Sequence, residues 1–138
     1  MARRDEYLEH LKTVPLFSQC TKKELTQLAR LITPVTVHAG TTFIREGEIA
    51  RELMIIEKGS ATVRRNGRKV ATLTTGAIVG ELAVVLERQR NASVTADTDL
   101  EVLVIDSRSF STLLDEIHGF ARKLLHTVAT RLAEQQTV

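Results

Sequence analysis

The sequence has a single cysteine, Cys20, no tryptophan and no long run of apolar residues. One cysteine cannot form a disulfide within the chain, so the cytoplasm is the default location. Without a long apolar run, no transmembrane helix is expected. The polar start, Met1–Glu6, is also unlike a secretory signal. Aromatic residues make up only 4% of the chain, which leaves few rings to stack nucleic acid bases.

Charge of either sign is not in large excess. The formal net charge is +2 at pH 7, too small by itself to indicate nucleic acid binding. One basic cluster surrounds the dipeptide Asn66-Gly67 and consists of Arg64, Arg65, Arg68 and Lys69. Asn-Gly is the strongest short signal for a hairpin turn, so we interpret the cluster as a solvated hairpin tip. Contact with a phosphate backbone is the alternative. From this chain alone we expect neither a nucleic acid partner nor a membrane partner.

The chain of 138 residues suits one domain, residues 1–138, and 43% hydrophobic residues supply one core. Residues 1–34 are expected to be helical. A first apolar stripe comprises Tyr7, Leu8, Leu11, Val14 and Leu16. A second helix begins after Thr21, which with Glu24 forms a capping box, and we expect Pro34 to end this helical zone. The apolar face of the second helix comprises Leu25, Leu28, Ala29 and Ile32.

Residues 35–106 alternate short β-rich runs with glycine-containing turns. The expected strands are Val35–Val37, Thr41–Ile44, Leu53–Glu57, Ala61–Arg65, Lys69–Leu73, Ser93–Ala96 and Leu100–Ile105. Residues 107–136 are expected to be helical, with a break at Gly119. Their apolar positions are Phe110, Leu113, Leu114 and Ile117, then Phe120, Leu124, Leu125, Val128 and Leu132. The predicted fold class is α+β, with an antiparallel, jelly-roll-like β-roll flanked by N-terminal and C-terminal helices.

The segment 80–94 contains the candidate ligand-binding residues. A short helical turn is expected over Gly80–Leu86, and the free amides at its start favour an anion. Small side chains, Ala83 and Ala92, let an anion approach the backbone. Arg90 follows the turn, and its planar guanidinium suits phosphate. Glu81 supplies a carboxylate at the same turn for a sugar hydroxyl.

This segment resembles the phosphate-binding cassette of the cyclic nucleotide-binding domain family, of the catabolite activator protein and protein kinase A regulatory subunit type. The resemblance lies in Gly80-Glu81-Leu82-Ala83-Val84-Val85 and in Arg90-Asn91-Ala92-Ser93-Val94. It extends over nearly the whole chain, through Pro15-Leu16-Phe17, Arg45-Glu46-Gly47-Glu48, Gly59 and Gly76. It implies a stand-alone bacterial member of the family.

The resemblance implies a role for each cassette residue. Glu81 accepts a hydrogen bond from the ribose 2′-hydroxyl, and Arg90 pairs with the cyclic phosphate. The amides of Ala83 and Asn91 donate to phosphate oxygens, next to the small Ala92. The Gly80 carbonyl faces the ribose, while Val79 and Leu82 make apolar contacts. The alternative for Glu81 and Arg90 is a plain surface ion pair.

Three residues depart from the family pattern. Val79 stands in place of the usual Phe, and Gln89 stands where Pro is common. Asn91 stands where cAMP-preferring members carry Ala or Ser and cGMP-preferring members often carry Thr. We expect a cyclic nucleotide as ligand, with cAMP favoured over cGMP.

Other chemistry has little support in the sequence. The histidines, His10, His38, His118 and His126, lack metal-ligand spacing, so no metal is expected. Cys20 has no neighbouring histidine to activate it. The serines considered as nucleophiles, Ser18, Ser60 and Ser93, lack an elbow of glycines. We therefore expect no enzyme activity and no cofactor.

The leading hypothesis is a regulatory sensor in signal transduction or transcription regulation, whose helices respond to the ligand. Its expected partners are an unidentified effector protein and a second copy bound through the final helix. The alternative is a degenerate β-roll that binds no ligand and serves as a dimerisation or protein-interaction scaffold. Because few residues follow Leu132, no DNA-reading domain is expected, and Met1 suggests a natural start. The alternative is that the chain is a fragment of a larger regulator.

Overall fold

The computed structural model describes residues 2–14, 17–79, 88–116 and 119–136. The chain divides into two compact units, one formed by Met1–Leu31 with Arg108–Val138 and the other by Ile32–Ser107. The first unit is helical and the second is built of strands. That the two together form a single domain stays a prediction.

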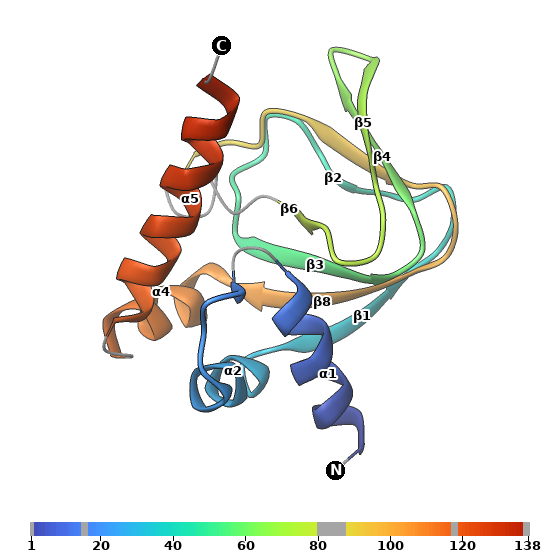
Figure 1. Ribbon diagram of the computed structural model, residues 1–138. Coiled ribbons are helices and arrows are strands. Elements are labelled where there is room, and N and C mark those ends of the chain that lie inside the picture. The colour runs from blue at the N-terminus through green and yellow to red at the C-terminus, as the bar shows by residue number, and fades with distance from the viewer. Residues whose placement is uncertain (1, 15–16, 80–87, 117–118, 137–138) are drawn as a thin grey trace. The chain divides into compact units, whose positions relative to one another are not determined.

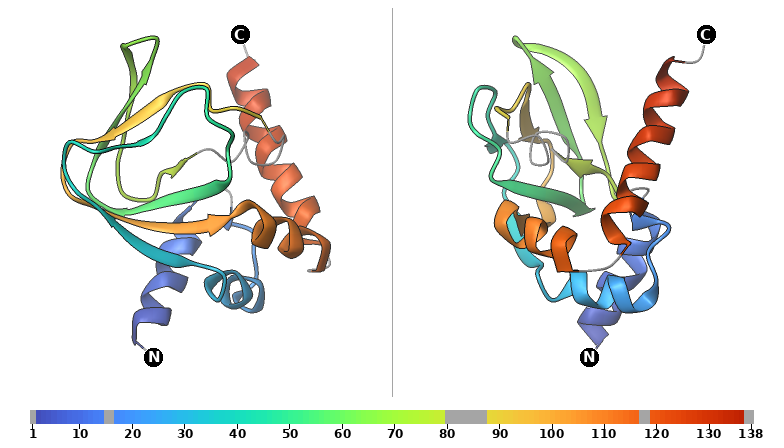
Figure 2. Two further views of the ribbon diagram at one scale, coloured as in Figure 1. Left: turned by 180° about the vertical axis from the view of Figure 1, so that it is seen from behind. Right: turned by 90° about the vertical axis from the view of Figure 1, so that its left-hand side faces the viewer.

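Two antiparallel sheets of four strands make up the strand unit (Figure 1). One has the order β1-β8-β3-β6 and the other β2-β7-β4-β5. The strands are β1 (Thr33–Val37), β2 (Thr42–Ile44), β3 (Glu52–Lys58), β4 (Ala61–Arg65), β5 (Arg68–Leu73), β6 (Ile78–Val79), β7 (Ser93–Ala96) and β8 (Leu100–Asp106). The views in Figure 2 show the two sheets facing each other across a shared interior. This arrangement confirms the predicted antiparallel β-roll with helices at both ends of the sequence.

Residues at alternate positions of the strands fill that interior. On β3, Met54 and Ile56 face inward, and on β8, Val102 and Val104 do so. The other buried members of this core are Val37, Ile44, Ala61, Val79, Val94, Ala96 and Leu100, which come from both sheets. The alternate residues Leu53 and Ile55 of β3 and Leu103 and Ile105 of β8 are also buried, with their side chains on the other face of the sheet.

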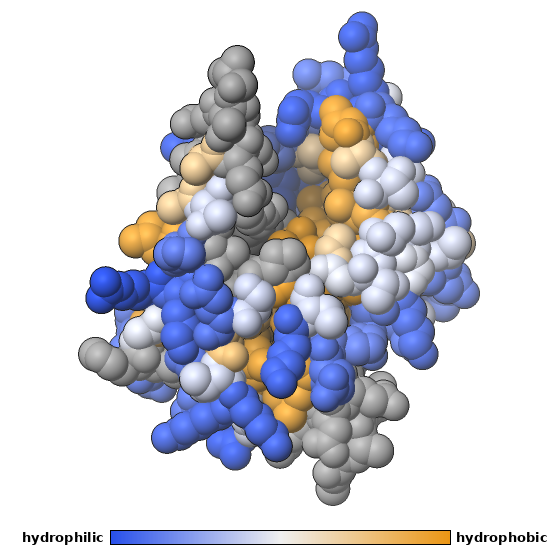
Figure 3. Space-filling model, in the orientation of Figure 1, coloured by the Kyte–Doolittle hydropathy of each residue, from blue (hydrophilic) through white to orange (hydrophobic). Residues whose placement is uncertain are grey.

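The predicted hairpin turn at Asn66-Gly67 joins β4 to β5. Both residues have positive φ, 53° and 77°, as a two-residue turn of this kind requires. The basic residues around it, Arg64, Arg65, Arg68 and Lys69, are exposed. Figure 3 shows hydrophilic residues at the hairpin tip. The interpretation as a solvated tip therefore agrees with the structure.

The predicted boundary at Pro34 is wrong. The second helix ends at Ala29 with Arg30 as its C-cap, and Pro34 lies within β1. Because β1 is at the edge of its sheet, a residue without an amide proton is tolerated there. The short strand β6 was not expected from the sequence. It pairs with β3 through Met54 and Val79.

The helical unit contains α1 (Ala2–Thr13), α2 (Lys22–Ala29), α4 (Ser107–Glu116) and α5 (Phe120–Gln136) among the described residues. The capping box of α2 is confirmed. The Thr21 hydroxyl accepts from the Glu24 amide at 3.2 Å, and the Glu24 carboxylate accepts from the Thr21 amide at 2.8 Å. The predicted break at Gly119 is also confirmed, since this residue has φ of 83° between α4 and α5.

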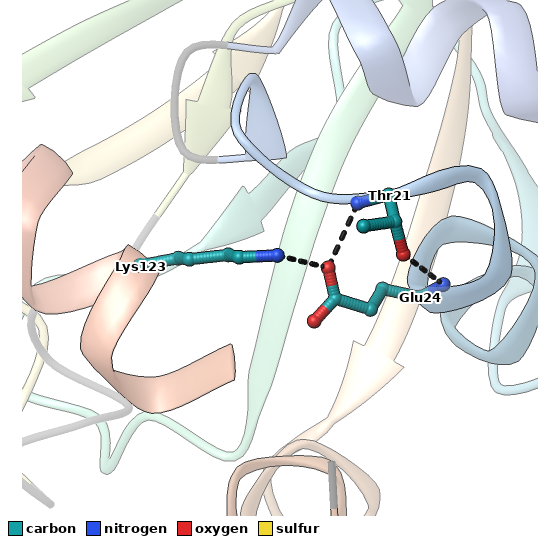
Figure 4. Close-up of polar contacts among 3 residues, drawn as sticks. All are labelled: Thr21, Glu24 and Lys123. Carbon is teal, nitrogen blue, oxygen red and sulfur yellow. Dashed lines mark hydrogen bonds and ion pairs between the residues drawn. The ribbon is translucent and has the colours of Figure 1, made fainter. Parts of the chain in front are cut away.

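An ion pair and an aromatic contact join α5 to the segment around the start of α2. Lys123 Nζ lies 2.5 Å from the Glu24 carboxylate that caps α2 (Figure 4). The rings of Phe17 and Phe120 lie with their centroids 6.3 Å apart. Burial opposes ionisation of Glu24, but the hydrogen bonds from Lys123 and Thr21 outweigh it, and the pKa of Glu24 is lowered.

Not every apolar residue of the final helix is buried. Phe120 and Leu124 are buried and Val128 is half-buried, whereas Leu125 is 67% exposed. The predicted stripe is therefore wrong for Leu125, because one step along a helix turns a side chain by about 100° away from Leu124. Among the described residues, no helix is both long and apolar enough to cross a membrane.

Candidate functional site

The backbone of Arg90 is held by the turn that follows β2. The Arg90 amide donates to the Glu48 carbonyl at 2.7 Å, and the Gly47 amide donates to the Arg90 carbonyl at 2.8 Å. Gly47, with φ of 90°, occupies the turn position that favours glycine. A bridge between Ile49 and Gln89 continues this pairing. Two segments about forty residues apart thus fix the position of Arg90.

The side chain of Arg90 is buried, with 8% of the residue exposed. Its Nη2 donates a hydrogen bond to the backbone carbonyl of Glu52, the first residue of β3. Burial lowers the pKa of the guanidinium, and the Glu52 carboxylate opposes this effect. A buried arginine is uncommon unless paired. Glu81 lies outside the described residues, so the alternative of an ion pair between Glu81 and Arg90 stays open.

A cavity of about 360 Å³ lies beside Arg90 within the strand unit. Its described lining combines apolar and charged side chains: Phe43, Ile44, Arg45, Glu48, Ile49, Arg51, Glu52, Met54 and Arg90. Three of these residues are arginines and two are glutamates, so the cavity offers both donors for an anion and acceptors for hydroxyl groups. Its volume lies within the range of small-molecule sites.

The predicted cassette residues are only partly described. Val79 is buried in the roll interior on β6, and Ala92 is buried just before β7. Asn91 is exposed. The other predicted contacts, Gly80, Glu81, Leu82 and Ala83, lie outside the described residues, as does the expected helical turn. Their roles stay predictions.

The β4–β5 hairpin is tied to the segment that carries Arg90. Arg65 Nε donates to the Asn91 carbonyl at 3.1 Å. The Asn66 amide donates to the Glu46 carboxylate at 3.1 Å, and the Glu46 amide donates to Ser93 Oγ at 2.9 Å. These bonds hold the hairpin, the turn after β2 and the start of β7 together around one end of the roll.

The sequence interpretation missed Glu52, Arg51 and Arg45 as cavity residues. Glu52 could have been found from the alternation of β3, which places it on the same face as Met54 and Ile56. Arg45 lies in the turn through which the family resemblance runs. Its place at the same cavity as Arg90 depends on the pairing of that turn with the segment around Arg90, which is distant in the sequence.

Other candidate chemistry finds little support in the described structure. Cys20 is buried, and burial together with the nearby Glu24 charge raises the pKa of its thiol to about 11 despite Lys123. A thiol with so high a pKa is a poor nucleophile at neutral pH. Among the described residues, no three His, Cys, Asp or Glu side chains gather as a metal site would require.

Fold and site together define the class of protein. It is a β-roll domain with flanking helices, a polar cavity at the roll and a buried arginine beside that cavity. The model of the cyclic nucleotide-binding domain matches residues 34–116. The chain belongs to the cyclic nucleotide-binding domain family, as its cassette predicted.

Known proteins of this family resemble the chain over most of its length. A cAMP-dependent protein kinase regulatory subunit of Schizosaccharomyces pombe is 38% identical over 109 residues, which are 78% of this chain and 26% of that protein. The N-terminal domain of a transcriptional regulator from Streptomyces coelicolor superposes with a TM-score of 0.82 at 26% identity, covering 92% of this chain and 94% of that one. The regulatory domain of Toxoplasma gondii PKA with cAMP gives 0.79 at 26% identity, covering 94% of this chain and 51% of that one. The chain thus spans about a quarter of the curated kinase subunit.

Proposed function

We propose that this domain binds a cyclic nucleotide in the cavity beside Arg90, with cAMP favoured over cGMP, and acts as a regulatory sensor without enzyme activity or cofactor. The observation that carries the proposal is the buried guanidinium of Arg90 at a cavity of about 360 Å³. A buried cation is stabilised by an anionic ligand, and the planar fork of arginine can hold two phosphate oxygens at once.

Contacts within the chain fix the position of Arg90. Its backbone pairs with the turn at Gly47 and Glu48, and Nη2 is held by the Glu52 carbonyl. A site prepared in this way loses little conformational entropy on binding. In the proposal the cyclic phosphate meets Arg90, while Glu81 accepts from the ribose 2′-hydroxyl.

The preference for cAMP rests on the kinase relative, which is named as cAMP-dependent, and on the Toxoplasma gondii domain, which was solved with cAMP. Asn91 is exposed and can donate a hydrogen bond. If Asn91 donated to a guanine base, cGMP would bind more tightly than cAMP, and a titration with cGMP measures this.

The proposed sensor response concerns the final helix. A ligand can shift a helix only if it binds one conformation better than another. We expect ligand to protect the amides of residues 119–133 from hydrogen exchange, in addition to protecting the segment around Arg90. Equal exchange in the final helix with and without saturating cAMP would make the domain a passive binder.

The test of binding is a calorimetric titration of the whole chain with cAMP and with cGMP. We expect both to bind and cAMP to bind more tightly. Tighter binding of cGMP would contradict the preference alone. If neither nucleotide produced heat or raised the melting temperature, the binding proposal would fail and the protein-interaction scaffold would take its place.

A further inference from the structure

We infer that Glu52 sets the ligand charge that the cavity accepts, so that a singly charged cyclic phosphate is admitted in preference to a doubly charged phosphate monoester such as 5′-AMP. This inference rests on the proposed function and adds a specificity-determining residue to it. Neither the family match nor the cassette motif assigns a role to Glu52, which lies on β3, far in the sequence from residues 80–94.

Glu52 is the exposed first residue of β3 and lines the cavity. Residues two apart on a strand share a face, and Met54 and Ile56 both belong to the interior core. Glu52 is therefore on the interior face, at the end where the apolar residues stop. Glu52, Met54 and Arg90 line the same cavity.

Glu52 is also bound directly to Arg90 through its own backbone. Arg90 Nη2 donates to the Glu52 carbonyl, which fixes the guanidinium next to this residue. The charge of Glu52 acts on the guanidinium, since it opposes the lowering of the Arg90 pKa by burial. A phosphate that binds Arg90 in this cavity shares the cavity with Glu52.

Repulsion from Glu52 depends on the charge of the ligand. A cyclic phosphodiester carries one negative charge, whereas a phosphate monoester has a second pKa of about 6 and approaches two negative charges above pH 7. Coulomb energy is proportional to the product of the charges, so Glu52 repels the monoester about twice as strongly as the cyclic ester. Attraction to Arg90 stabilises both bound ligands. Repulsion from Glu52 offsets part of the extra attraction that the second negative charge of the monoester gains from Arg90.

The test compares cAMP and 5′-AMP in the wild-type chain and in Glu52→Gln, by calorimetry at a pH of about 7.5, where the monoester is mostly doubly charged. Because Glu52 is exposed, loss of its charge should tighten cAMP binding by about two- to fivefold. Binding of 5′-AMP should tighten by about the square of the factor measured for cAMP, because the free energies differ twofold. Differences in shape between the ligands cancel, since the same two ligands are compared in both variants.

Two further variants sharpen the result. Glu52→Asp keeps the charge and should keep the preference for cAMP. Glu101→Gln removes a charge of the same sign from the opposite end of β3, where Glu101 pairs with Lys58. Six residues of strand separate Lys58 from Glu52, which is about 20 Å and well beyond the screening distance in physiological salt. This control should leave both affinities unchanged.

The outcomes separate the inference from the function on which it rests. If the wild-type chain binds cAMP but Glu52→Gln changes both affinities equally, or neither, the inference on Glu52 is wrong and the proposed function stands. If the wild-type chain binds neither ligand, both are wrong. A gain for 5′-AMP well above that for cAMP, absent in Glu52→Asp and Glu101→Gln, supports the inference.

Discussion

Replacing Lys123 with methionine removes the charged partner of a buried carboxylate while keeping most of the apolar stem. The Glu24 side chain is 9% exposed and that of Lys123 is 30% exposed. Breaking a fully buried pair costs about 3–5 kcal/mol, because the remaining charge loses its partner. Here the cost is smaller, since water reaches Lys123 and Glu24 still accepts from the Thr21 amide. We expect a loss of about 1–3 kcal/mol in the free energy of unfolding.

Urea unfolding followed by circular dichroism measures this loss. Arg122 precedes Lys123 on α5 and is exposed, so Arg122→Met is a matched control that removes the same charge. It should change stability by less than about 0.5 kcal/mol, as most surface substitutions do. A loss in Lys123→Met no larger than that of the control would refute the reasoning.

The same pair predicts a dependence on pH. Because the folded state lowers the pKa of Glu24 below its ordinary value of 4.5, the stabilisation is present above that pH. It is lost as the pH falls through the lowered pKa of the folded state. Wild-type stability should therefore decline in acid more steeply than that of Lys123→Met. Parallel stability curves in acid would contradict this sign.

Three further predictions concern single positions. Gly59→Ala should lower the free energy of unfolding by more than about 2 kcal/mol, because φ is 104° and a Cβ would lie 2.5 Å from the Asp99 carbonyl oxygen. Gly40→Ala should lower it less, because its Cβ would meet no atom within 4 Å. Thermal melts of the two variants compare these losses. Cys20 should react slowly with iodoacetamide at neutral pH and rapidly in denaturant, because its folded pKa is about 11, and rapid labelling of the folded chain would contradict its burial. A 2′-deoxy cyclic nucleotide should bind more weakly than cAMP if Glu81 accepts from the ribose, and equal calorimetric affinities would remove Glu81 from that role.

Local features were the ones that the sequence predicted well. The capping box at Thr21 and Glu24 and the turn at Asn66-Gly67 depend on residues three or fewer positions apart, and both are present. The strands expected at Leu53–Glu57 and Leu100–Ile105 are likewise present, as β3 and β8, because each is a short β-rich run that can be recognised from its own residues.

Features that depend on pairing between distant segments were predicted less well. The sequence around Pro34 has the signal of a helix end, but its place in an edge strand depends on pairing with β8. β6 has two residues and exists only because β3 lies beside it. The contribution of Glu52 to the cavity likewise depends on the ladder between residues 45–50 and 88–90, which no short motif encodes.

The most direct test of the account is the affinity of Arg90→Ala for cAMP, measured by calorimetry beside Arg90→Lys and the exposed hairpin variant Arg68→Ala. Loss of the charge-assisted contact should cost about 2–4 kcal/mol, or about 30- to 700-fold in affinity. Arg90→Lys should recover part of this loss because it keeps the charge but not the planar fork, and Arg68→Ala should bind as the wild type does. Melting curves that show all three variants folded make the comparison valid. Unchanged cAMP affinity in folded Arg90→Ala would contradict the central claim that this buried arginine holds the cyclic phosphate.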